Sequence, residues 1–182
     1  MPVMEPIRDL AILEDFKERL QTWNMRNWMF FVLGINTGLR VSDILPIKVK
    51  NVLGTHILLT EKKTSKRRRI LINPKLRADI DYYLACYDWL TEEDYLFASQ
   101  ATGKPITTVQ AYRILRQIAD IMGLESIGTH TMRKTFGYHF YQRTKDIATL
   151  QLLLNHSTQR MTMLYIGLIQ DTMDESMSDF HL

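Results

Sequence analysis

Cysteine is nearly absent from this sequence of 182 residues, which contains only Cys86. A single cysteine cannot form a disulfide within the chain, and no cluster of cysteine and histidine has the spacing of zinc ligands. No stretch approaches about 18 uninterrupted apolar residues, as a membrane span would require. Residues 1–10 also lack the apolar core and small-residue cleavage site of a secretion signal. We therefore expect a cytoplasmic protein with no membrane partner, and no metal or other cofactor.

The composition is that of a globular protein, with 46% hydrophobic and 24% charged residues. A chain of this length can bury a sizeable core and is normally one domain. No internal repeat, low-complexity tract or flexible linker divides the sequence. We therefore expect a single domain over residues 1–182.

The pattern of apolar residues predicts a mostly helical α+β fold with a small antiparallel sheet. Residues 56–60 and 68–72 are β-prone and are joined by a polar basic segment, which predicts a hairpin. Helical spacing recurs in residues 10–20, 28–37, 74–87, 108–122, 131–143, 146–154 and 158–165. Residues 166–182 form a tail in which the apolar side chains also follow helical spacing, so we expect an amphipathic helix there.

Positive charge is concentrated in one segment of the chain. The formal net charge is +3, and six positive charges fall within residues 62–69, so the remaining residues are together mildly acidic. Such a patch suits binding to the phosphates of nucleic acid, and a solvated hairpin tip is the alternative. The candidate DNA-binding residues in the patch are Lys62, Lys66, Arg67, Arg68 and Arg69.

Several other residues are candidates for chemistry, although each has an ordinary structural explanation. Arg40 follows a glycine of the type that ends helices. His130 and Arg133 are three apart, as neighbours on an exposed helix face would be. His156 could be a core or capping histidine, and Tyr165 could serve packing alone. None of these residues identifies an enzyme by itself.

Taken together and in order, these segments resemble the tyrosine recombinases, the phage-integrase and Xer-type family. Residues 37–43 (TGLRVSD) are similar to the first arginine box of the family, and residues 130–136 (HTMRKTF) to its H-x-x-R box. Residues 152–156 (LLLNH), followed nine residues later by Tyr165, are similar to its L-L-G-H…Y box. Lys63 is similar to the lysine of the family's catalytic β-hairpin. The resemblance covers nearly the whole chain and implies the fold of the family's catalytic domain.

The resemblance implies a function for each of these residues. Tyr165 would be the nucleophile that forms a 3′-phosphotyrosyl bond with DNA. Arg40 and Arg133 would bind the non-bridging oxygens of the phosphate with their planar guanidinium groups. His156 would donate a hydrogen bond to the phosphate, and Lys63 would protonate the departing 5′ oxygen. A metal ion and ATP would not be needed.

Two positions, His130 and Asp43, leave alternatives open, and a third, Asn155, departs from the family pattern. His130 either accepts the proton of the nucleophile or only hydrogen-bonds the phosphate. Asp43 stands where the family usually has glutamate, and it either orients Arg40 or caps the helix that follows Gly38. Asn155 replaces the glycine of the L-L-G-H box.

The resemblance implies a site-specific recombinase that cuts and rejoins double-stranded DNA. We expect a homotetramer on DNA and a monomer or weak dimer without it, with the tail of residues 166–182 docking on its own domain or on a neighbouring protomer. The family's N-terminal DNA-clamping domain is expected to be absent, which fits either a fragment or a short stand-alone member. Relaxation of supercoils in the manner of a type IB topoisomerase, and DNA-binding regulation without catalysis, are the alternative functions.

Overall fold

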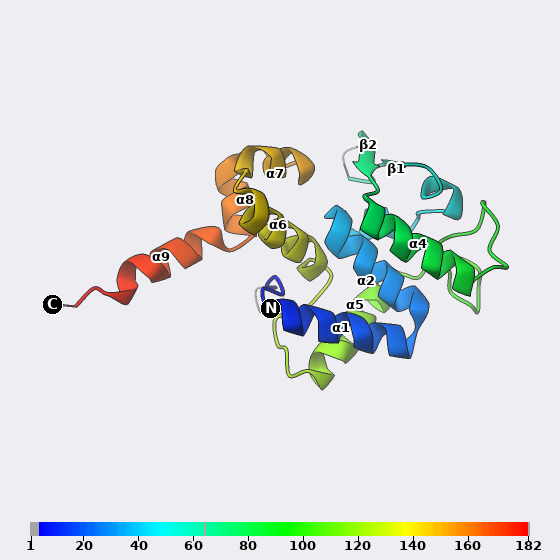
Figure 1. Cartoon of the computed structure of the whole chain (residues 1–182), viewed down its shortest axis with the longest axis horizontal. Coiled ribbons are helices and arrows are strands. Elements are labelled where there is room, and N and C mark those ends of the chain that lie inside the picture. Colours follow the sequence, from blue (N-terminus) through cyan, green and yellow to red (C-terminus); the bar gives the residue numbers. More distant parts are fainter. Residues whose placement is uncertain (1–3, 64, 182) are drawn as a thin grey trace.

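The computed structural model describes residues 4–63 and 65–181 (Figure 1). The described part is mostly helical with one two-stranded antiparallel sheet, so the expected fold class is confirmed. Its elements are α1 (Leu10–Trp23), α2 (Met25–Thr37), α3 (Val41–Ile44), the 3₁₀ helix η1 (Val49–Asn51), β1 (His56–Thr60), β2 (Arg67–Leu71), α4 (Pro74–Cys86), α5 (Thr108–Ile121), α6 (Thr131–Thr144), α7 (Ile147–Leu153), α8 (Gln159–Tyr165) and α9 (Leu168–Ser178).

Helix α2 forms the centre of the larger core. It packs against α1, α4 and α6, and its residues from Asn27 to Gly34 are all buried. A helix that is apolar on every side is stable only when it is covered on every side. At Gly34 the neighbouring helix approaches closely, because an added Cβ would lie only 2.6 Å from the sulfur of Met132. Helix α2 thereby places its C-terminal end, where the first arginine box begins, directly beside α6.

Local sequence signals account for several helix ends. Asp9, Asn24, Asn73 and Thr107 each accept hydrogen bonds from backbone N–H groups at the start of the following helix. The helix α2 ends at the left-handed residue Gly38, as the sequence predicts. The 3₁₀ helix η1 was not predicted, and α3 was expected only as the helix that Asp43 might cap, because three or four residues are too few to show a periodic pattern.

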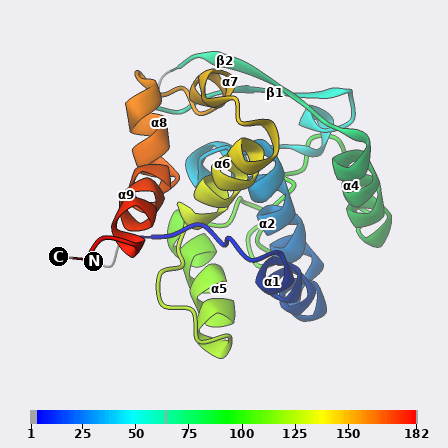
Figure 2. The same cartoon turned by 60° about the vertical axis from the view of Figure 1, so that its left-hand side comes forward.

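The hairpin differs slightly from its predicted bounds. Strand β2 covers Arg67–Leu71, where residues 68–72 were expected. Its register pairs Thr60 with Arg67 and His56 with Leu71. Figure 2 shows the hairpin lying beside α7, and hydrogen bonds from Arg68 to that helix agree.

A second, smaller apolar cluster is built from α6, α7 and α8. Leu150, Leu154 and Ile166 are buried in it, and Phe136 packs against them. Helix α6 joins the two cores, since Met132 belongs to the larger one. The first turn of α6 therefore lies where the cores meet, and it carries the predicted H-x-x-R box.

Helix α9 contributes no buried residue and projects away from the body of the domain (Figure 1). Its Asp171 accepts a hydrogen bond from Arg8 at 2.6 Å, which links the tail to the N-terminal segment. Among the described helices, none has both the length and the apolar character to cross a membrane.

Candidate active site

Four of the predicted site residues come from three separate parts of the chain that meet at one place. Arg40 follows α2, His130 and Arg133 belong to the start of α6, and Tyr165 ends α8. Arg40, His130 and Arg133 line the same cavity of about 210 Å³. The rest of its wall consists of Val41 and three short polar residues, Ser42, Thr108 and Thr129. A hollow with two guanidinium groups and several hydroxyls has the chemistry of a phosphate site.

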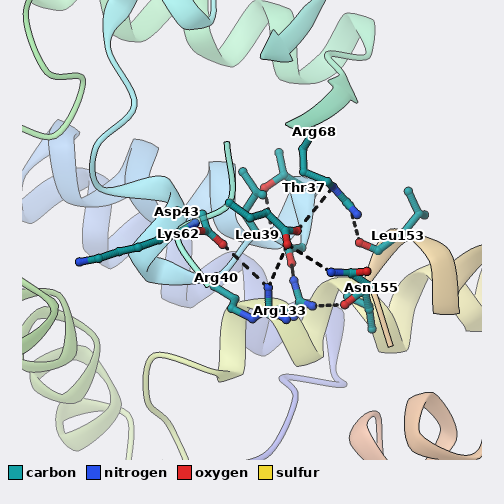
Figure 3. A network of polar contacts seen from close by, with 12 residues as sticks. Thr37, Leu39, Arg40, Asp43, Lys62, Arg68, Arg133, Leu153 and Asn155 are labelled. Atoms are coloured by element: carbon teal, nitrogen blue, oxygen red, sulfur yellow. Dashed lines mark hydrogen bonds and ion pairs between the residues drawn. The ribbon is translucent and has the colours of Figure 1, made fainter. Parts of the chain in front are cut away.

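Arg133 holds the three motifs of the site together. Its side chain is buried, and it donates hydrogen bonds to the backbone carbonyls of Gly38 and Leu154 (Figure 3). Burial lowers the pKa of Arg133 to about 10, which the nearby Tyr165 and Glu61 oppose, so the group stays positively charged at neutral pH. A guanidinium has five N–H donors. Arg133 can therefore hold both backbone segments and still present donors to a phosphate.

Two structural constraints favour glycine at position 38, two residues before Arg40. Gly38 has a φ of +63°, a conformation that other residues adopt only with strain. An added Cβ would also collide with the ring of Phe136. Gly38 therefore allows α2 to end against α6, and this contact sets the position of Arg40 two residues later.

Tyr165 lies within reach of a histidine and of positive charge. Its hydroxyl oxygen is 3.4 Å from Nδ1 of His130, and the ring of His156 meets its ring edge-on at 5.1 Å. Burial raises the pKa of Tyr165, while Arg133 and Arg40 act in the opposite direction. The hydroxyl is thus protonated at rest, and the charges that would stabilise a phenolate are close to it.

Both histidines are held in the neutral form. Loss of hydration is the main cause of the lowered pKa of His130, and the charges of Arg133 and Lys134 add to it. The same causes, burial first and then Arg133 and Arg40, lower the pKa of His156 to about 4. Nδ1 of His156 is 3.1 Å from the hydroxyl oxygen of Thr162, which fixes the plane of the ring. A neutral histidine can accept a proton, so His130 is suited to act as a base.

The alternative that Asp43 caps a helix is wrong. Arg40 occupies the N-cap position of α3, and Asp43 lies inside that helix. The carboxylate of Asp43 is buried; one oxygen accepts the backbone N–H of Lys62 at 2.8 Å, and the other is 4.0 Å from Nη1 of Arg40. Aspartate is too short to serve both partners closely. Asp43 therefore forms a hydrogen bond with the hairpin loop but only a long ionic contact with Arg40.

The basic hairpin divides into an outer and an inner part. Lys62, Lys63, Lys66, Arg67 and Arg69 are exposed. Arg68 turns inward, donating to the carbonyls of Leu152 at 3.3 Å and Leu153 at 2.6 Å, and it also pairs with Glu61 at 3.6 Å. Lys63 lies in the loop between the strands, and within residues 4–63 and 65–181 no contact joins it to the cluster of Tyr165 and the arginines.

Sequence reasoning missed three residues at the site. Glu61 is buried beside Arg40, Thr162 contacts His156, and the ammonium of Lys134 lies 5.4 Å from the centre of the Tyr165 ring. Only Glu61 gave a signal, as an acidic residue directly before the basic segment. Among the described residues, no three His, Cys, Asp or Glu side chains gather as ligands of a metal ion would.

This chain is similar in sequence and in structure to known proteins. The sequence model of the phage integrase family matches residues 9–170, which include all the motif residues. This chain belongs to that family. A relative described as probable integrase/recombinase YoeC, from Bacillus subtilis (strain 168), is 52% identical over 173 residues, which are 94% of each protein. The expected membership of the tyrosine recombinases, and with it the expected function of a site-specific recombinase, is thereby confirmed.

Longer members of the family match this chain over only part of their own length. A tyrosine recombinase of Pseudothermotoga lettingae is 30% identical over 149 residues, 80% of this chain and 51% of that relative. The chain thus spans about half the length of that relative.

Solved structures share the fold at low sequence identity. The XerH site-specific recombinase bound to palindromic difH substrate has a TM-score of 0.75 and 22% identity, over 98% of this chain and 53% of that one. A lambda integrase (75–356) dimer bound to a COC′ core site has a TM-score of 0.70 and 18% identity, over 92% of this chain and 61% of that one. The catalytic-domain fold expected from the sequence is therefore the fold of this chain.

Proposed function

We propose that this family member cuts and rejoins double-stranded DNA through a covalent bond between Tyr165 and a 3′ phosphate. The observation that carries the proposal is the convergence of Tyr165, His130 and Arg133 beside the cavity that Arg40 lines. A nucleophile, a base and two fixed cations are the groups that metal-free cleavage of a phosphodiester requires. A protein that only bound DNA would have no need to place a tyrosine there.

The cleavage step begins at the hydroxyl of Tyr165. A free tyrosine has a pKa of about 10, so it must lose its proton as it attacks. His130 receives that proton at Nδ1 while the phenolic oxygen bonds to phosphorus. Arg40 and Arg133 stabilise the negative charge that develops on the non-bridging oxygens.

The bond between phosphorus and the 5′ oxygen then breaks, and the leaving oxygen takes a proton from Lys63. DNA bound against the hairpin would bring the loop with Lys63 to the phosphate. Rejoining is the reverse, with a 5′ hydroxyl attacking phosphorus and Tyr165 leaving. The phosphotyrosyl bond keeps the energy of the broken phosphodiester, so neither ATP nor a metal ion takes part.

The exposed cations of the hairpin are suited to the DNA backbone. Lys62, Lys66, Arg67 and Arg69 would neutralise phosphates near the cleavage site. Arg68 differs from these residues because its guanidinium faces inward and donates to the carbonyl of Leu153 at the end of α7. We assign Arg68 to the support of the hairpin and the other four residues to DNA.

The tail suits assembly on DNA. Met173, Met177 and Phe180 are exposed. Helix α9 contains no fully buried residue, and only its first residue, Leu168, packs against the smaller apolar cluster. Docking of these side chains on a neighbouring protomer would join active sites in a tetramer that holds two DNA sites. The similar proteins support DNA as the partner of this chain. The proposed tetramer is supported by the exposed apolar side chains of the tail alone.

The experiment is a trap for the covalent intermediate. The protein is incubated in EDTA with duplexes that carry a nick just downstream of the target position, so that the short fragment with the free 5′ hydroxyl diffuses away after cleavage. A denaturing gel should show a protein–DNA adduct with the wild type and none with Tyr165→Phe, which should still bind DNA. A well-folded, DNA-binding protein that forms no adduct on the site it binds would favour the non-catalytic regulator instead.

A further inference from the structure

A buried carboxylate that no motif predicts lies at the centre of the site. Glu61 follows strand β1 and is only 2% exposed. A carboxylate removed from water to this degree is strongly destabilising unless opposite charges and hydrogen bonds surround it. Glu61 is therefore held in place by the groups that it contacts, and it holds them in turn.

Those contacts come from three parts of the chain. Oε2 of Glu61 is 3.6 Å from Nη1 of Arg40, and it accepts a hydrogen bond from Nδ2 of Asn155 at 3.3 Å. Oε1 is 3.6 Å from Nε of Arg68. Figure 3 shows Arg40, Arg68 and Asn155 around this point. One carboxylate thus links the first arginine, the hairpin and the turn after α7.

Glu61 lies closer to Arg40 than the expected partner does. The separation from Arg40 is 3.6 Å for Glu61 and 4.0 Å for Asp43, whose other oxygen is bonded to the backbone of Lys62. Asp43 is one methylene shorter than the glutamate usual at its position. Glu61 supplies, from the hairpin, the carboxylate contact that Asp43 makes only distantly.

Asn155 fits the same arrangement. It has a φ of +49°, in the left-handed region where glycine and asparagine are the usual residues. Asparagine keeps the turn that glycine would make and adds an amide that reaches Glu61. Arg68 secures the same turn through the carbonyl of Leu153. His156 directly follows Asn155, so the two contacts fix the backbone from which His156 extends.

The main chain of Glu61 also closes the loop that carries Lys63. Its N–H donates to the carbonyl of Lys66, and its carbonyl accepts from the N–H of Ser65, both at 2.9 Å. The position of this loop relative to the cavity is thus coupled to the position of the Glu61 side chain.

We propose that Glu61 is a positioning residue for DNA cleavage, which sets the guanidinium of Arg40 against the phosphate and ties the Lys63 hairpin to the His156 turn. The inference rests on the proposed function. Glu61 itself touches no reacting atom. Because Glu61 acts through the charge of Arg40, its loss should slow cleavage mainly when the phosphate is negatively charged. Loss of a purely structural residue would slow cleavage of charged and uncharged substrates alike.

The test compares Glu61→Gln with the wild type on two trapping substrates. One has a normal phosphate at the cleavage position, and the other has a methylphosphonate, in which a methyl group replaces one charged oxygen. Glutamine keeps the size of the side chain and its bond to Asn155 but removes the charge that orients Arg40. On the phosphate we expect adduct formation to be slower by about 10- to 100-fold, with DNA affinity within about threefold.

On the methylphosphonate the defect of Glu61→Gln should shrink to within about threefold, because no full negative charge remains for Arg40 to meet. An equal defect on both substrates would overturn the inference, since misfolding slows both reactions alike. Absence of adduct from the wild type on the phosphate substrate would instead refute the proposed function, and the inference with it. Glu93→Gln is the matched control, because Glu93 pairs with Lys48 and Lys50 on the exposed surface away from the site.

A second variant keeps the test decisive if Glu61→Gln does not fold. Glu61→Asp retains the charge but draws it back by one methylene. It should show a smaller defect on the phosphate substrate with the same relief on the methylphosphonate. A Glu61→Asp protein with wild-type rates on both substrates would also overturn the inference.

Discussion

Nδ1 of His130 lies 3.4 Å from the hydroxyl oxygen of Tyr165, although 35 residues separate them in the sequence. The contact joins the start of α6 to the end of α8 across the smaller apolar cluster. It places a neutral base next to a tyrosine whose pKa is raised by burial. The distance is slightly long for a hydrogen bond, and such contacts in active sites tighten when substrate binds.

Replacement of Arg133 by lysine should damage both catalysis and stability. Lysine cannot present the guanidinium fork that bonds Gly38, Leu154 and a phosphate together. First-strand cleavage of a trapping substrate should fall by about 10² to 10³. The free energy of unfolding in urea should fall by about 1 to 3 kcal/mol, because buried carbonyls lose their donors. Arg19→Lys on the exposed face of α1 is the control, and cleavage within threefold of wild type would contradict the assignment.

Gly38→Ala should be more destabilising than the same change at another glycine with positive φ. Gly103 has a φ of +65° and open space around its Cα, whereas an added Cβ at Gly38 meets Phe136. Gly103→Ala should cost about 1 kcal/mol for the backbone conformation alone. Gly38→Ala should cost about 1 to 3 kcal/mol more through overpacking. Urea unfolding of the two variants measures the difference, and equal values would mean that the contact with Phe136 adjusts freely.

Stability should fall as the pH drops from about 6.5 towards 4, in part because of His156. In the unfolded chain a histidine binds its proton near pH 6.5, whereas burial lowers the pKa of the folded His156 to about 4. Between these values the unfolded state binds more protons, so acid favours unfolding. His130, with its pKa lowered as well, acts in the same direction.

The measurement for this prediction is urea unfolding at pH 7 and pH 4.5. His156→Gln should lose less stability between the two values than the wild type, by on the order of 1 kcal/mol for a half-buried ring. His181→Gln in the exposed tail should behave like the wild type. If His156→Gln shows the full wild-type loss of stability, His156 is protonated as easily folded as unfolded.

Removal of residues 171–182 should leave the domain stable but impair assembly. Helix α9 buries no residue, and the pair of Arg8 and Asp171 is exposed, so the free energy of unfolding should change by less than about 1 kcal/mol. Adduct formation on a single site should persist, while exchange of strands between two sites should be lost. Light scattering with DNA present should show the loss of the tetramer.

A matched pair of full-length variants separates the two faces of the tail. Met173→Gln with Met177→Gln alters the apolar face and should reproduce the truncation. Asp174→Asn with Glu175→Gln alters the acidic residues and should assemble normally. If neither the truncation nor the apolar variant changes the mass of the protein–DNA complex, the tail has no part in assembly.

The sequence by itself determined most of the fold and most of the residues proposed for the site. Helix ends were predictable because their signals are local, as at Gly38 and at the capping residue Thr107. Arg40, Arg133, His156 and Tyr165 were predictable because each lies in a short motif whose spacing survives in the chain. Asp43 was predicted as a site residue. Whether it caps a helix or orients Arg40 depends on distances that the sequence does not give.

Tertiary structure alone decided how the basic segment is used. Six neighbouring cations look alike in the sequence, yet Arg68 turns inward because the carbonyls at the end of α7, 84 and 85 residues away, lie beneath it. Glu61 became part of the site only when folding brought Asn155, 94 residues later, against its carboxylate. Charge pairing acts through space and leaves no periodic pattern along the chain. Local signals therefore fixed the elements and the motifs, and packing fixed which charges meet.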